Sequence, residues 1–282
     1  MSRLLFAVIV GLFALSANAR NVDVLMSLAT RDFAALDAYI DGLEAGFSKR
    51  EVSERELIDA FRPFYKQDDI LSAKFNEWVE KRPTSYGAVL ARGVYRRKLG
   101  ELGRGRKTVN LTPTENLDYM HKQFELAKED FRAAQQLRPG TYLVAVNLLN
   151  VAQFEGDEAG ARRYLDLANK AYPQNFIARA RYLTTLRPRW GGSQAMMRSF
   201  IEESSTHGAS EQQVRWLKAI QYEDLGSDTF AQGDRKKTRE YLVEALSLSA
   251  DADDGFRANY LEFASWFCFG PERQDESSCQ RR

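Results

Sequence analysis

The sequence predicts an all-α fold, a stack of antiparallel helical hairpins that forms an α-solenoid with irregular repeats. Two observations support this prediction. Apolar residues recur at helical spacing along most of the chain, and four positions at the ends of two predicted helices recur together. These positions are Ala127, Phe131, Ala134 and Pro139 in one helix and Ala161, Leu165, Ala168 and Pro173 in the other. Each pair is 34 residues apart, the period of tetratricopeptide repeats, so we expect a tetratricopeptide-like stack.

Residues 1–19 have the pattern of a signal peptide. A positive charge at Arg3 precedes an apolar run over residues 4–15, and small residues end the segment at Ala19. Twelve apolar residues are too few to span a bilayer, which takes about 20, although an uncleaved anchor is the alternative. We therefore expect a periplasmic or secreted protein that keeps no membrane anchor after cleavage.

The balance of charged residues bears on whether the chain binds nucleic acid. Without Arg3, the mature chain carries 39 basic and 39 acidic residues. This balance argues against a nucleic-acid partner, which requires a basic surface. The apolar content of 44% is enough for a sizeable core.

Residues 20–82 are predicted to form N-terminal helices. Helical spacing runs from Val22 to Phe47, with an interruption near Arg31. Ser53 and Glu56 have the spacing of a capping box, and Pro63 implies a kink or an early stop in the helix that they begin. The next helix is capped by Asp68 or Asp69 and ends before Pro83.

Residues 83–270 are predicted to be the helical repeat region. Its first helix is capped by Thr84 or Ser85 and runs to about Leu99. Residues 100–112 contain three glycines and several basic residues, so we expect an exposed basic loop there. A long helix follows from Pro113 to about Arg138, with Thr112 as its N-cap.

Two further hairpins and a terminal helix complete this region. Residues 142–154 and 156–173 form the best hairpin, joined by a turn at Gly156. Pro188 ends the next helix, and Ser193 and Ser210 cap the two helices that follow. An aromatic-rich helix over residues 252–267 is expected to cover the end of the stack.

Both cysteines, Cys268 and Cys279, lie near the C-terminus. Export would expose them to an oxidising compartment, so we predict a disulfide that ties the polar tail 271–282 to the last helix. The alternative is two unpaired thiols, with Cys268 packed among aromatic residues. Neither alternative suggests catalysis, because a Cys-x-x-Cys motif is missing.

The chain resembles the bacterial domain-of-unknown-function family 4034, a group of mostly exported, tetratricopeptide-like proteins. The resemblance covers most of residues 30–205 and is strongest at the sequence Leu-Arg-Pro-Arg-Trp-Gly-Gly-Ser of residues 186–193. Further matching segments are Asp32-Phe33, Leu36-Asp37, Trp78-Val79, Arg82-Pro83-Thr84-Ser85 and the small-residue helix 88–95. The chain departs from the family in one place. In the family an aromatic residue and an Arg-Gly pair follow the small-residue helix, and here only the pair Arg104-Gly105 is present. The resemblance implies the fold and leaves the function open.

The turn at residues 187–193 is the sharpest candidate site. Arg187, Arg189 and Trp190 can bind an anionic or aromatic group there. The alternative, which we favour, is a structural turn in which Trp190 is a buried wedge and the arginines pair with nearby carboxylates.

The basic loop is the second candidate. Arg104, Arg106 and Lys107 can bind an acidic partner, although a solvated loop is the simpler interpretation. His121 and His207 lack metal-ligand spacing, and motifs for a nucleophile, a phosphate loop or a dinucleotide are missing, so we expect neither a metal nor a cofactor.

We therefore expect a non-catalytic protein- or peptide-binding module of the bacterial cell envelope. A hydrolase with a site in the solenoid cleft is one alternative, and a cleft with two ionisable groups of strongly shifted pKa would favour it. A toxin inhibitor or immunity protein is another. The oligomeric state stays open.

Overall fold

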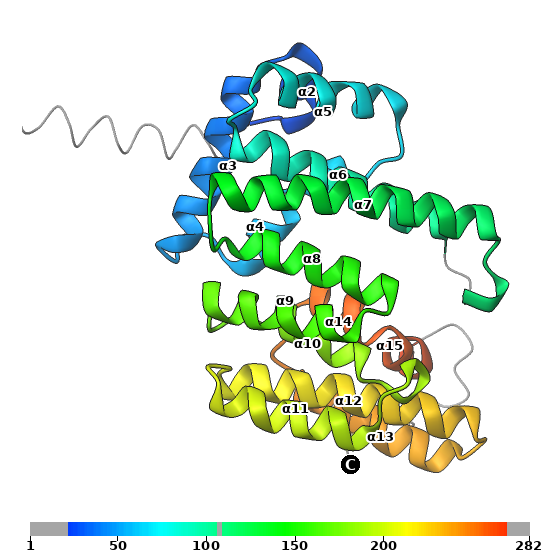
Figure 1. The fold of residues 1–282 in the computed structure, drawn as a ribbon. Coiled ribbons are helices and arrows are strands. Elements are labelled where there is room, and N and C mark those ends of the chain that lie inside the picture. The colour runs from blue at the N-terminus through cyan, green and yellow to red at the C-terminus, as the bar shows by residue number, and fades with distance from the viewer. Residues whose placement is uncertain (1–21, 106–108, 270–282) are drawn as a thin grey trace, which may run out of the picture. The chain divides into compact units, whose positions relative to one another are not determined.

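The computed structural model describes residues 22–105 and 109–269, and all the regular elements within these ranges are helical. The predicted all-α fold with neighbouring helices packed in pairs is thus confirmed. The chain forms two compact units, of which the first ends at Leu167 and the second begins at Ala168 (Figure 1). The predicted signal peptide, Arg106, Lys107, Cys279 and the tail 271–282 lie outside the described residues.

The first unit begins with two helices, α2 (Val24–Thr30) and α3 (Phe33–Ser48). The predicted interruption is at Arg31, whose backbone is left-handed with φ of 64°. Asp32 caps α3 by accepting a hydrogen bond from the backbone N–H of Ala35. The carboxylate therefore gives the chain a new helix start directly after the break.

The next elements are α4 (Glu54–Asp59), the short 3-10 helix η2 (Arg62–Phe64) and α5 (Asp69–Lys81). The predicted capping box of Ser53 and Glu56 is present, and α4 ends before Pro63. Asp68 caps α5 as predicted. Both α3 and α5 contact α6 (Tyr86–Arg104), which Ser85 caps.

The most extensive helix contact of the first unit joins α6 to α7 (Thr114–Leu137) (Figure 1). Here the structure corrects the predicted loop 100–112, because α6 continues to Arg104 and a 3-10 helix, η3 (Val109–Leu111), precedes α7. The reason is packing. A Cβ atom at Gly100 would lie 2.6 Å from Cε1 of Phe124, so the glycine serves close helix approach. Pro113, not Thr112, is the N-cap of α7.

The hairpin of α8 (Tyr142–Glu155) and α9 (Glu158–Ala171) follows. Gly156 makes the turn with φ of 70°, a conformation that glycine adopts without strain. The repeat positions agree with the predicted period: α7 and α9 each end two residues before a proline. The equivalent apolar residues are all buried, namely Ala127, Phe131, Ala134, Ala161, Leu165 and Ala168.

The second unit contains α10 (Ile177–Thr185), the 3-10 helix η4 (Pro188–Trp190), α11 (Gln194–Thr206), α12 (Glu211–Ala231) and α13 (Arg235–Leu248). The predicted caps are present at Ser193 and Ser210. Helices α12 and α13 make the most extensive contact of this unit, and Gly226 lies beneath the Leu242 side chain at their crossing.

The predicted helix over residues 252–267 is wrong in one respect, because the structure has two helices, α14 (Asp254–Tyr260) and α15 (Glu262–Phe269). The chain leaves helical geometry at Leu261, where ψ is 37° and φ is −125°. The Glu223 carboxylate binds the first backbone amides of α15 and so fixes a new helix start. Helix α15 also contacts α13.

Within residues 22–105 and 109–269, no helix combines the length and the apolar character that crossing a membrane requires.

Candidate functional site

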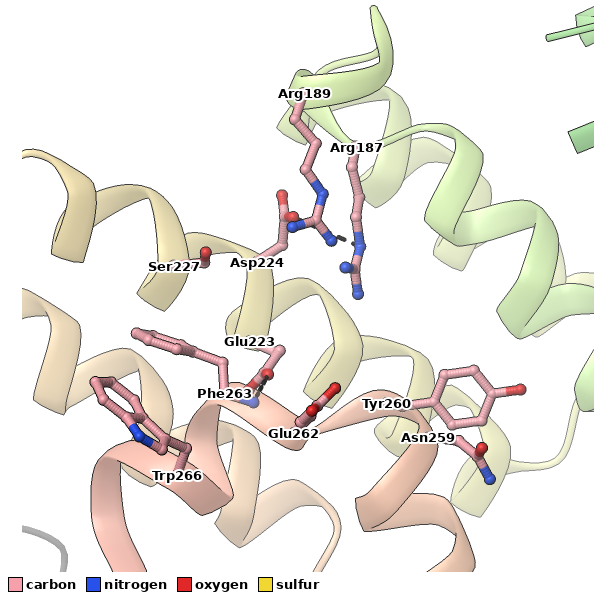
Figure 2. A pocket seen from close by; sticks show the side chains of 10 residues that line it. All are labelled: Arg187, Arg189, Glu223, Asp224, Ser227, Asn259, Tyr260, Glu262, Phe263 and Trp266. Carbon is pink, nitrogen blue, oxygen red and sulfur yellow. Dashed lines mark hydrogen bonds and ion pairs between the residues drawn. The ribbon is translucent and has the colours of Figure 1, made fainter. Parts of the chain in front are cut away.

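The second unit contains a cavity of about 500 Å³, lined by η4, α12, α14 and α15 (Figure 2). Five charged side chains line it: Arg187, Arg189, Glu223, Asp224 and Glu262. Aromatic side chains from α14 and α15 form another part of the wall. The cavity thus offers charge and apolar surface to the same ligand.

The sequence around η4 explains how two arginines reach the cavity. Pro188 begins the 3-10 helix, and Gly191 ends it with φ of 93°. The turn is tight, because a Cβ atom on Gly192 would lie 2.1 Å from the carbonyl oxygen of Leu186. Figure 2 shows the Arg187 and Arg189 side chains extending from this turn towards α12.

Arg187 is the buried cation of the site. It is 9% exposed, and its Nε lies 3.5 Å from Oδ1 of Asp224, an ion pair without hydrogen-bond geometry. Burial lowers the pKa of Arg187, and the positive charge of Arg189 lowers it further. Arg189 itself is exposed.

Glu223 is the buried acid of the site. Its Oε1 accepts a hydrogen bond from the backbone N–H of Phe263 at 2.8 Å, and its Oε2 accepts one from Ala264 at 3.1 Å. Burial raises the pKa of Glu223 to about 7, although these hydrogen bonds and the arginines act in the opposite direction. The carboxyl group therefore titrates near neutral pH.

Asp224 follows directly and is 2% exposed. Burial raises its pKa, while the charge of Arg187 opposes the rise. Its Oδ2 accepts a hydrogen bond from Nε2 of Gln194 at 2.8 Å. A side chain of α11 thus holds the carboxylate beside Arg187.

The aromatic part of the wall comes from Tyr260, Phe263 and Trp266. Phe263 and Trp266 stack with their ring centroids 5.7 Å apart. Trp266 is 45% exposed and lines the cavity.

The residues predicted at the turn have different positions. Arg187 and Arg189 line the cavity, whereas Trp190 does not. Trp190 is 55% exposed, so the buried wedge of our structural alternative is wrong. The Trp190 ring instead lies 5.9 Å from Cζ of Arg189. The pairing of an arginine with a carboxylate, expected by the same alternative, is present at Arg187.

The residues predicted in the basic loop are not at this cavity. Arg104 belongs to the first unit, where it is half-buried at the end of α6 with its Cζ 6.0 Å from the Phe154 ring. Arg106 and Lys107 lie outside the described residues. Cys268 is buried in α15, and its predicted pairing with Cys279 stays a prediction because Cys279 lies outside the described residues.

Sequence reasoning missed Glu223 and Asp224. The available signal was helical spacing, because Asp224 follows Leu217 by seven residues and Ile220 by four, which puts it on their buried face. Across the described part of the chain, no group of three histidine, cysteine or acidic side chains is arranged to hold a metal ion.

The fold and this site define an all-α protein of paired helices with a charged cavity in its second unit. Comparison with known sequences gives one family match. Residues 110–224 match the family described as "Domain of unknown function (DUF4034)", which confirms the predicted resemblance over that segment. No curated protein and no solved structure matches the chain.

Proposed function

We propose that the protein is a non-catalytic module of the cell envelope that binds a protein or a peptide. The observation that supports this proposal is the cavity of the second unit, where two arginines face acidic and aromatic side chains (Figure 2). Aromatic and arginine side chains are the residues that dominate binding energy at peptide and protein interfaces. The envelope location rests on the predicted signal peptide.

The arrangement of Glu223 favours binding over catalysis. Both carboxylate oxygens accept hydrogen bonds from the backbone of α15. A general base must instead direct an oxygen towards a substrate proton. The Glu223 side chain therefore serves the helix start, and the exposed Arg189 and Trp266 present the surface that a ligand meets.

A peptide-display selection on the purified chain tests this proposal. We expect the selection to enrich peptides with a shared consensus. Their dissociation constant should rise at least tenfold, about 1.4 kcal/mol in binding free energy, in Arg189→Gln and in Trp266→Ala. Matched controls are Arg198→Gln and Met196→Ala, two exposed side chains of α11 that do not line the cavity. Selection without enrichment, or peptides that bind all four variants equally, would contradict the proposal.

One observation favours a hydrolase as a second candidate. Glu223 has a pKa of about 7 and lines the cavity beside Asp224, whose pKa is also raised by burial. A carboxyl group with such a pKa is suited to general acid–base catalysis near neutral pH. A panel of chromogenic ester, glycoside and phosphate substrates tests it, with turnover lost in Glu223→Gln. Equal turnover by that variant would rule out this role of Glu223.

A further inference from the structure

The Arg187 guanidinium carries a positive charge into a buried position where its Nε–H group makes no hydrogen bond. Within the described residues, the Nε of Arg187 is fully enclosed and has no hydrogen-bond partner. The nearest carboxylate oxygen, Oδ1 of Asp224, is 3.5 Å from that nitrogen. Buried guanidinium groups are normally satisfied, because an unpaired buried donor is costly.

The neighbouring carboxylates already have other hydrogen-bond partners or are exposed to solvent. Asp224 is shared with Gln194, and the Glu223 oxygens are bound to α15. Glu262 lies at the cavity wall and is exposed to solvent. The two arginines extend from one short turn towards the same space, which brings like charges together (Figure 2). An anion between them would relieve the repulsion and accept from both groups.

We propose that the cavity binds a carboxylate group of the peptide ligand between the guanidinium groups of Arg187 and Arg189. This inference rests on the proposed binding function and names the ligand chemistry. A carboxylate is planar and matches the fork of a guanidinium group, and an adjacent aromatic side chain on the ligand fits Phe263 and Trp266. The carboxylate comes either from the C-terminus of the peptide or from an acidic side chain.

Three small probes separate these sources. N-acetyl-phenylalanine has a terminal carboxylate, its amide has none, and N-acetyl-glutamyl-phenylalanine amide has only a side-chain carboxylate. Binding is followed by NMR at the Nε–H signals of the arginines. We expect at least one carboxylate probe to bind tenfold more tightly than the uncharged amide and to shift the Arg187 signal.

Variants identify the side chains responsible. Arg189 is exposed, so Arg189→Gln should keep the fold while weakening the carboxylate probe at least tenfold. Arg187→Lys keeps the charge but loses the fork, and we expect a similar loss. Arg198→Gln, with its side chain exposed on α11, is the control and should bind as the unaltered chain does.

Equal affinity for all three probes, or no shift with any of them, would overturn the carboxylate site. The display selection separates this failure from failure of the binding function. Peptides that bind through the cavity without any carboxylate would leave the binding function standing and reject the carboxylate site. Selected peptides that carry a carboxylate, and lose affinity as amides, would support both.

Discussion

Oε1 of Glu223 accepts a hydrogen bond from the backbone N–H of Phe263, 40 residues further along the chain, at 2.8 Å. This contact joins the middle of α12 to the first turn of α15. It places a titratable side chain at the start of a helix and next to the cavity. A carboxyl group that lines the cavity therefore also holds the start of α15.

The stability of the protein should fall as the pH rises through neutrality because of Glu223. Its ordinary pKa of 4.5 is raised to about 7 in the folded chain. Between these values the folded state holds the proton and the unfolded state has lost it, so raising the pH favours unfolding. We expect this group to contribute a decrease on the order of 3 kcal/mol in the free energy of unfolding between pH 4.5 and 8, measured by urea denaturation.

Glu223→Gln isolates this contribution, because glutamine does not titrate and its amide oxygen can still accept from Phe263. The free energy of unfolding of the variant should exceed that of the unaltered protein at alkaline pH, and this difference should shrink as the pH is lowered. Curves that stay parallel over the range would show that Glu223 does not carry the dependence.

Removing Asp130 should destabilise the first unit strongly. This carboxylate is 2% exposed and binds Nη2 of Arg92 at 2.6 Å and Nη1 of Arg96 at 2.9 Å. Asp130→Ala leaves two partly buried arginines without their shared partner, at a cost of about 3–5 kcal/mol in the free energy of unfolding. Glu129→Ala, an exposed neighbour on the same helix, should change it by less than about 0.5 kcal/mol. Similar losses in both would contradict this role.

Gly93→Ala should destabilise the contact between α6 and α7. The added Cβ atom would lie 2.7 Å from Cε1 of Phe131. Overpacking of a core costs about 1–3 kcal/mol, and we expect it to outweigh the gain of about 1 kcal/mol in helix propensity. A Phe131→Leu background removes this nearest contact, so the alanine should destabilise the protein less than it does beside Phe131. A double-mutant cycle by urea denaturation measures this coupling, and additive effects would disprove it.

The carboxyl group of Asp251 should titrate well below its ordinary range. Nε2 of Gln212 and the indole N–H of Trp216 donate to it at 2.9 and 2.8 Å, and Arg215 lies 2.6 Å away. These contacts lower the pKa of Asp251 to about 2 from 3.8. Carbon NMR titration should give this value, and Trp216→Phe should raise it. An unchanged pKa in that variant would mean that the indole does not stabilise the carboxylate.

Local signals predicted most of the helix boundaries. An N-cap side chain binds a backbone amide at most three residues further along the chain, so the sequence shows both partners together. This is why the caps could be predicted at Ser53, Asp68, Ser85, Ser193 and Ser210. The 34-residue period was recognised for a similar reason, since each repeat buries equivalent positions.

Contacts between distant segments were beyond this reasoning. Gly100 and Gly103 resembled a loop, but they lie against Phe124 and Tyr119 of the next helix, and a glycine at a helix crossing looks like one in a turn. The break at Leu261 has neither glycine nor proline, and the carboxylate that binds the amides of the following helix start belongs to Glu223 on another helix. The cavity was not predicted because its lining residues come from separate segments of the chain. Only Arg187 and Arg189 belong to a recognisable motif.

The 40-residue distance between Glu223 and Phe263 also bears on the order of events during synthesis. The ribosome completes α12 well before it makes the amides that bind this carboxylate. Until α15 docks, Glu223 either stays in water or is buried with its proton. The last helix of the described chain thus completes the second unit. A chain that ends before this helix lacks the backbone amides that bind the Glu223 carboxylate.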